Sequence, residues 1–168
     1  MSVIVLIGVP GAGKTTVGEL LAKTLNVTFK DSDQLVETAS GKSVSDIFIQ
    51  DGEATFRKLE EDQIAQALSD KDGVLALGGG ALGSSQTLEN IKGHQVIWLI
   101  AGLSTAVERV GMNRNRPLLL GNVRGQLSSL LNAREPLYRS AATISVDTTD
   151  MTPDAVCEAI VSQLPKDE

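Results

Sequence analysis

A glycine-rich segment near the start of the chain carries a lysine and two threonines at a spacing suited to phosphate chemistry. Residues 8–16 fit the pattern G-x-x-x-x-G-K-[ST]. The glycines permit a tight turn whose backbone N–H groups point at an anion, and Lys14 adds a point charge for the β- and γ-phosphates. The hydroxyl of Thr15 can ligate Mg²⁺. We therefore expect an ATP site formed by Gly11, Ala12, Gly13, Lys14, Thr15 and Thr16.

The segments on either side of this phosphate loop (residues 8–16) support that expectation. Residues 3–7 are apolar and largely β-branched, which predicts a buried strand. Apolar residues at 17, 20, 21 and 25 have helical spacing. The motif indicates phosphate binding only when it lies between a strand and a helix, and the sequence predicts both. The alternative, a glycine-rich turn without a ligand, is disfavoured for the same reason.

Two acidic residues, Asp31 and Asp33, follow a second predicted strand at 27–31. Ligands of parallel sheets gather at the carboxyl ends of strands, so these acids are placed for metal or substrate binding. Asp33 is also a plausible N-cap for the helix that follows, and Ser32 competes for that position. Capping accounts for one acid better than for two.

Two further features could bind an anionic or hydroxylated substrate. Arg57 and Glu60 are neighbours on one face of a predicted helix at 53–69, where the alternative is a solvated salt bridge. A third strand at 74–77 ends in three glycines, residues 78–80, which we call the glycine turn. Three consecutive glycines suggest that another group comes very close to the backbone, although a plain loop is the alternative.

A basic segment follows the fourth predicted strand. Residues 111–121 have a glycine at each end and include Arg114 and Arg116. Flexible ends with positive charge between them favour a mobile lid that closes over phosphate, and an exposed basic loop is the alternative.

The remaining elements alternate between strand and helix. Strands are predicted at 2–8, 27–31, 74–77, 95–100 and 142–146, with helices between and after them. Alternation predicts an α/β fold with a parallel sheet and helices on both faces. Pro136 should kink or end the helix that contains Leu131 and Arg134. The length of 168 residues fits a single domain, residues 1–168.

Composition narrows the class of protein further. Fifteen Lys and Arg against 21 Asp and Glu give a net charge of −6, which disfavours general nucleic-acid binding. A lone cysteine, Cys157, excludes an intrachain disulfide and fits buried packing in an amphipathic helix. No apolar stretch is long enough to span a membrane, and no signal peptide is recognisable. We expect a cytoplasmic protein.

Together the motifs resemble those of the shikimate kinases, and the resemblance covers nearly the whole chain. It is carried by residues 8–16, 31–33, 46–48, 52–53, 56–57, 78–80 and 116–119, and by Arg134 with residues 136–138. The resemblance implies a P-loop NTPase fold like that of nucleoside monophosphate kinases, with five strands in the order 2-3-1-4-5 and a mobile lid at about 112–121. It implies Mg²⁺-dependent transfer of the ATP γ-phosphate to the 3-hydroxyl of shikimate, in the synthesis of chorismate and the aromatic amino acids, by a monomer.

The resemblance also implies roles for single residues. Asp33 would orient or deprotonate the substrate hydroxyl, and Arg116 would reach the phosphates from the lid. Thr15 would ligate Mg²⁺ directly and Asp31 through water. The substrate would be bound by helices at about 33–62 and by Asp33, Arg57, Glu60, Gly79, Gly80 and Arg134, with Val44, Phe48 and Phe56 on its apolar side.

Two positions depart from the family pattern, and two other functions are possible. Residues 147–152 lack the arginine often found near the adenine, and Ala76 replaces a residue that often carries a hydroxyl. Another small-metabolite kinase, such as a gluconate kinase, would share the phosphate loop and lid. A non-catalytic nucleotide switch would need a segment that senses the γ-phosphate.

Overall fold

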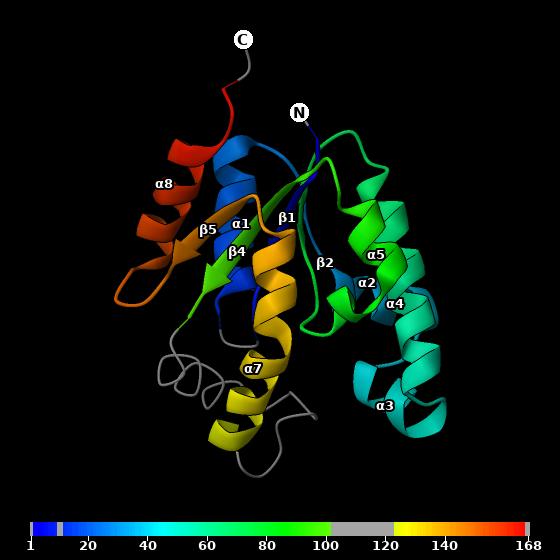
Figure 1. The fold of residues 1–168 in the computed structure, drawn as a ribbon. Coiled ribbons are helices and arrows are strands. Elements are labelled where there is room, and N and C mark those ends of the chain that lie inside the picture. The colour runs from blue at the N-terminus through cyan, green and yellow to red at the C-terminus, as the bar shows by residue number, and fades with distance from the viewer. Residues whose placement is uncertain (1, 10–11, 102–122, 167–168) are drawn as a thin grey trace.

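The chain forms a five-stranded parallel sheet. The computed structural model describes residues 2–9, 12–101 and 123–166. The sheet has the order β2-β3-β1-β4-β5 (Figure 1), which confirms the predicted fold. Its strands are β1 (Ile4–Ile7), β2 (Phe29–Asp31), β3 (Val74–Ala76), β4 (Gln95–Ile100) and β5 (Ile144–Asp147). Only β4 has both of its predicted bounds: β1 and β2 each begin two residues later than expected, β1 and β3 each end one residue earlier, and β5 covers 144–147 instead of 142–146.

Helices cover both faces of this sheet. α1 and α8 pack against each other on one face, and α7 crosses the other face in front of β4 (Figure 1). The helices α2 to α5 gather beyond the β2 edge of the sheet, where α4 contacts α2, α3 and α5. Their bounds are α1 (Lys14–Leu25), α2 (Ser32–Ser40), α3 (Val44–Gln50), α4 (Glu53–Leu68), η1 (Ala81–Gly83), α5 (Ser85–Asn90), α7 (Val123–Ala141) and α8 (Pro153–Gln163).

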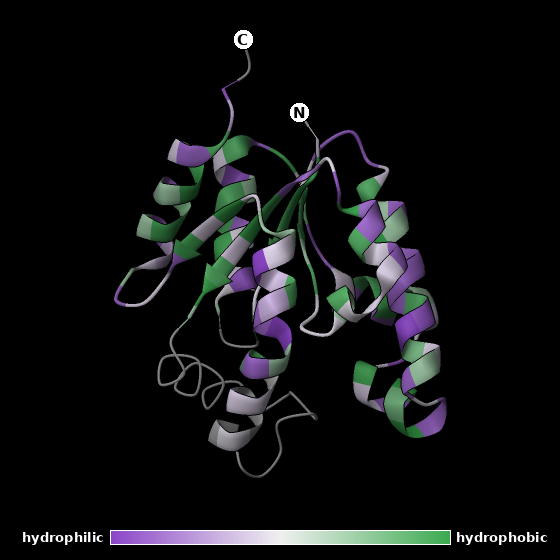
Figure 2. Ribbon diagram, in the orientation of Figure 1, coloured by the Kyte–Doolittle hydropathy of each residue, from purple (hydrophilic) through white to green (hydrophobic). Residues whose placement is uncertain are grey.

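Apolar side chains form two separate clusters. The main core joins the central strands to the helix faces that cover them, and Figure 2 shows apolar residues concentrated there. A smaller cluster of Val36, Ile47 and Phe56 lies between α2, α3 and α4, with Val44, Phe48 and Leu59 packed against it. The substrate-binding helices expected from the sequence therefore have an apolar centre of their own.

Two glycines set the distance between the phosphate loop and the sheet. A Cβ on Gly8, whose φ is +151°, would lie 2.7 Å from the carbonyl oxygen of Leu99. A Cβ on Gly18 would lie 2.3 Å from the Phe29 ring, so α1 packs on β2 closer than any side chain would allow. Gly8 thus lets the start of the phosphate loop approach β4, and Gly18 lets α1 approach β2.

The helix with Pro136 does not end there. α7 runs on to Ala141, and the N–H of Ala142 donates to the carbonyl of Tyr138 at 3.0 Å. Proline removes one intrahelical bond, but Leu137 and the buried Tyr138 pack the next turn onto the main core. Packing outweighs the lost bond, so the helix does not end at Pro136 itself but continues for five residues beyond it, and a kink at Pro136 stays a prediction.

Candidate active site

The phosphate loop turns directly into α1. Gly13 is the N-cap residue, with left-handed φ and ψ of 93° and 19°, and the first helical residue is Lys14. The Lys14 ammonium donates to the carbonyl of Gly8 and, at 3.2 Å, to that of Val9. This places its charge at the mouth of the loop, next to the positive end of the helix dipole. Gly11, expected to bind nucleotide, lies outside the described residues, and Thr16 is exposed beside Thr15.

Asp31 lies next to the phosphate loop and also begins α2. Its Oδ1 accepts from the backbone N–H of Asp33 at 2.9 Å, so the N-cap is Asp31, and the expectation of Asp33 or Ser32 is wrong. Its Oδ2 accepts a hydrogen bond from the Thr15 hydroxyl at 3.4 Å. The resemblance to shikimate kinases assigns both residues to Mg²⁺, and the fold brings them together. They offer hard oxygen donors of the kind that Mg²⁺ prefers.

The described residues contain no group of three or more His, Cys, Asp or Glu side chains able to hold a metal. A magnesium ion bound to a nucleotide keeps several waters and takes phosphate oxygens, so one hydroxyl and one carboxylate fit it. Ala76, in β3, is buried and pairs in register with Leu6 and Asp31, and its methyl group adds no donor.

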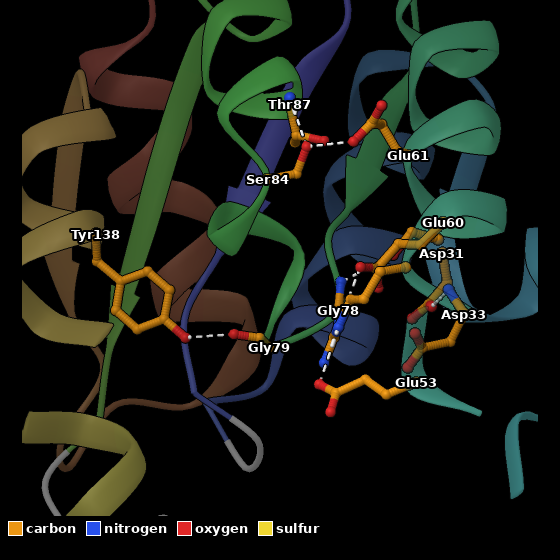
Figure 3. Close-up of polar contacts among 12 residues, drawn as sticks. Asp31, Asp33, Glu53, Glu60, Glu61, Gly78, Gly79, Ser84, Thr87 and Tyr138 are labelled. Carbon is orange, nitrogen blue, oxygen red and sulfur yellow. Dashed lines mark hydrogen bonds and ion pairs between the residues drawn. The ribbon is translucent and has the colours of Figure 1, made fainter. Parts of the chain in front are cut away.

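The side chains of Asp33, Arg57 and Glu60 meet at the glycine turn. Figure 3 shows Asp33 and Glu60 beside Gly78. A Cβ on Gly78 would lie 2.7 Å from Asp33 Oδ1 and 3.0 Å from Glu60 Oε2, and one on Gly80 would lie 2.4 Å from Arg57 Nη2. The close approach inferred from three glycines is therefore confirmed, with protein side chains as the approaching groups. A plain loop would not need it.

The Arg57–Glu60 pair is not a solvated surface bridge. Arg57 Nη1 lies 2.9 Å from Glu60 Oε1, and the Glu60 side chain is only 3% exposed. Its Oε2 has no hydrogen-bond partner among the described residues. Glu53, on the exposed side of α4, lies 3.5 Å from Arg57 Nε. A buried carboxylate thus holds one end of the guanidinium in place.

The electrostatics of Glu60 bring Arg134 into the same group. Burial raises the pKa of Glu60, the guanidinium of Arg57 opposes that rise, nearby Asp33 adds to it and Arg134 opposes it. Arg134, on α7, is therefore within electrostatic reach of a carboxylate on α4. Arg57 and Arg134, which lie far apart in the sequence, thus both influence the same carboxylate.

An apolar surface adjoins the arginines. The rings of Phe48 and Phe56 lie 4.8 Å apart, and the guanidinium of Arg57 stands 5.2 Å over the Phe56 ring. Val44 and Phe48 are half-buried, whereas Phe56 is buried in the small cluster. The Phe56 ring thus helps to hold the Arg57 guanidinium in place through a cation–π contact.

Sequence reasoning missed two residues of this site. Ser32 and Tyr138 hydrogen-bond the backbone of the glycine turn, from α2 and α7 respectively. Tyr138 is the one tyrosine of the chain, which was a signal that its hydroxyl needs a partner when buried. The sequence pattern marks Ser32 only as a possible N-cap and does not indicate that it bonds the glycine turn. The expected lid at 112–121, with Arg116, lies outside the described residues.

A parallel sheet of this order, with a phosphate loop after its central strand and cationic side chains across from that loop, defines a P-loop kinase of small molecules. Comparison with known proteins narrows the class. A profile described as shikimate kinase matches residues 10–165, and the chain belongs to the shikimate kinase family. Its activity is ATP-dependent phosphorylation of a small-molecule alcohol.

Individual relatives agree with the profile. A shikimate kinase of Thermobifida fusca is 50% identical over 96% of this chain and 94% of its own length. One of Mycobacterium avium is 48% identical over 96% and 92%. The solved structure of the shikimate kinase from Acinetobacter baumannii in complex with shikimate superposes with a TM-score of 0.92 at 35% identity, covering 96% of this chain and 92% of the other.

Proposed function

We propose that this chain transfers the γ-phosphate of ATP to the 3-hydroxyl of shikimate with the help of Mg²⁺, as a single kinase domain acting as a cytoplasmic monomer. The observation that carries the proposal is the meeting of Asp33, Arg57 and Glu60 at the glycine turn. This turn follows β3, which pairs in parallel with β1, the strand that leads into the phosphate loop and Lys14. Relatives called shikimate kinase support the substrate. No described helix is both long and apolar enough to cross a membrane.

The residues take roles that follow from their chemistry. Arg57 and Arg134 clamp the substrate carboxylate, because a guanidinium fork matches a carboxylate in shape and charge. Glu60 holds Arg57 in position. Asp33 orients and deprotonates the attacking hydroxyl, and Gly79 and Gly80 bring backbone against the substrate. Helices within 33–62 supply most of these groups.

The residues on the nucleotide side neutralise the negative charge of the phosphates. Lys14 binds the β- and γ-phosphates, and Arg116 reaches them from a lid at 112–121. Thr15 and Asp31 would hold the Mg²⁺, directly and through water. The ion, when bound, offsets the negative charge that develops on the transferred group. The chain's own part is to align the hydroxyl and the phosphate while keeping these cations in place.

Incubation of the protein with ATP, Mg²⁺ and candidate acceptors tests the proposal. Shikimate should be consumed together with ATP, and gluconate should not. ATP consumption with gluconate alone would support the other kinase function. Nucleotide binding without transfer to either acceptor would support a switch.

Loss of either clamp arginine should weaken shikimate binding strongly and ATP binding little. Truncating one member of a buried charge pair costs about 2–5 kcal/mol, and Arg57→Ala leaves the buried Glu60 carboxylate unpaired. Arg134→Ala removes the second fork. Calorimetric titration of both ligands, each into both variants, measures the effect.

Arg139→Ala is the matched control for the arginine variants. It lies on α7 with Arg134, but its side chain is exposed and pairs with Glu135 at 2.6 Å. Its shikimate affinity should equal that of the unmodified protein. Unchanged shikimate affinity in Arg57→Ala or Arg134→Ala would remove that residue from the substrate site.

Asp31→Asn should raise the Mg²⁺ concentration needed for half-maximal rate. Loss of an outer-shell carboxylate costs about tenfold or more in metal affinity, so excess Mg²⁺ should partly restore the rate. Asparagine also caps helices well, so α2 keeps its start. A Mg²⁺ titration of the steady-state rate checks this, with Asp70→Asn as control, because Asp70 pairs with Lys30 at a distance from the phosphate loop. An unshifted titration curve for Asp31→Asn would contradict the assignment.

A further inference from the structure

The glycine turn is hydrogen-bonded on two sides by side-chain hydroxyls. The backbone N–H of Gly78 donates to Ser32 Oγ at 2.8 Å, and the hydroxyl of Tyr138 donates to the carbonyl of Gly79 at 3.2 Å. Figure 3 shows Tyr138 reaching the turn from α7, on the side opposite Asp33. Neither bond belongs to a helix or to the sheet. Two peptide groups of one turn, 77–78 and 79–80, are thus held by two elements far apart in the sequence.

Both hydroxyls are buried, so the loss of either hydrogen bond would leave a buried backbone group without a partner. Ser32 is 0% exposed and Tyr138 is 2% exposed. A buried backbone group that loses its partner cannot turn to water instead. The Tyr138 ring is also fixed by Trp98, whose ring centroid lies 5.9 Å away. The hydroxyl therefore has a defined position from which to hold Gly79.

The turn has little room to shift without moving the groups around it. The side chains of Asp33 and Glu60 lie so close to Gly78, and that of Arg57 so close to Gly80, that neither glycine has room for a Cβ. Tyr138 is also linked to the second clamp arginine. Burial raises the pKa of the Tyr138 hydroxyl, and the charge of Arg134 and a hydrogen bond from it oppose that rise. The hydroxyl that bonds the glycine turn is therefore within electrostatic reach of Arg134.

We propose that Ser32 and Tyr138 are positioning residues that fix the glycine turn relative to Asp33, Arg57 and Arg134, and so set the affinity of the enzyme for its acceptor substrate. The inference rests on the proposed function. Neither residue needs to touch the substrate. Ser32 ties the turn to the start of α2, where Asp33 stands, and Tyr138 ties it to α7, where Arg134 stands. The phosphate loop is not part of this link, so the nucleotide should be little affected.

The test measures steady-state constants for Tyr138→Phe and Ser32→Ala. Each variant should raise the KM for shikimate about tenfold, the effect of losing a hydrogen bond worth about 1.4 kcal/mol. The KM for ATP and kcat should change by less than about twofold. Ser32→Thr keeps the hydroxyl and should restore the KM for shikimate.

Thr143→Val is the matched control. Thr143 Oγ1 also joins two elements, accepting from Val96 N at 2.9 Å, but it lies at the opposite end of the strands. It should lower the melting temperature and leave both KM values unchanged. Unchanged KM for shikimate in Tyr138→Phe and Ser32→Ala would overturn the proposal, as would a fall in kcat alone, which indicates a smaller folded fraction. The unmodified protein separates the two claims, since failure of the proposed function would leave it inactive with shikimate.

Discussion

Replacement of Lys14 by alanine should abolish phosphoryl transfer, with a fall in kcat of about 10³-fold or more, because the variant loses a charge aimed at the transferred group. Lys14 opens α1 and holds its ammonium against the carbonyls of Gly8 and Val9. Alanine is a good helix former, so α1 should still start at this position. Turnover of shikimate and ATP, measured alongside circular dichroism, checks the expectation.

Lys23→Ala is the control for this variant. Lys23 lies in the last turn of the same helix and is exposed. It removes one positive charge from the same helix without touching the phosphate loop, and its turnover should be unchanged. Near-normal turnover by a natively folded Lys14→Ala protein would contradict the role of Lys14.

Asp33→Asn should lower kcat by about 10²-fold or more, the usual contribution of general acid–base help. Asparagine keeps the size of the side chain and can still hydrogen-bond, but it neither accepts the proton nor carries charge. The Asp33 carboxylate packs against Gly78, and asparagine fits the same space. Affinity for ATP should change only modestly. Steady-state rates at saturating shikimate and ATP measure the effect.

A Mg²⁺ titration separates Asp33 from Asp31. Excess Mg²⁺ should not restore the rate of Asp33→Asn, whereas it should partly restore that of Asp31→Asn. Rescue of Asp33→Asn by Mg²⁺, or equal responses of the two variants, would show that the division of roles is wrong even if the chain phosphorylates shikimate.

The sheet could be predicted because each strand carries its own signal. Residues 3–7 and 96–100 are continuous apolar runs, which is how buried parallel strands appear in a sequence. The strand order, in contrast, came from the resemblance. Strand ends at 27–28 and 142–143 were placed wrongly because apolar residues outside a strand look like those within it. The short helices η1 and α5 were not predicted at all.

The sequence indicated which types of residue form the candidate site, but it did not indicate which of them contact one another. Glycines 78 and 80 signalled close approach, yet only the fold identifies Asp33, Glu60 and Arg57 as the approaching groups. Ser32 bonds a partner 46 positions away in the sequence, and no local pattern encodes that distance. Asp31 is the N-cap because β2 ends at Asp31 and α2 begins at the next residue. The sequence pattern alone did not determine where, within two residues, the helix begins.

The two apolar clusters have a consequence for how such an enzyme can diversify. The phosphate loop and α1 rest on the main core, while α2, α3 and α4 share the small cluster of Val36, Ile47 and Phe56. α4 belongs to both clusters, because its Ile64, Ala67 and Leu68 lie in the main core. Substitutions of Val36 and Ile47, on α2 and α3, would therefore reshape the acceptor side with the least effect on the strands that carry the nucleotide, since effects at distant sites are nearly additive.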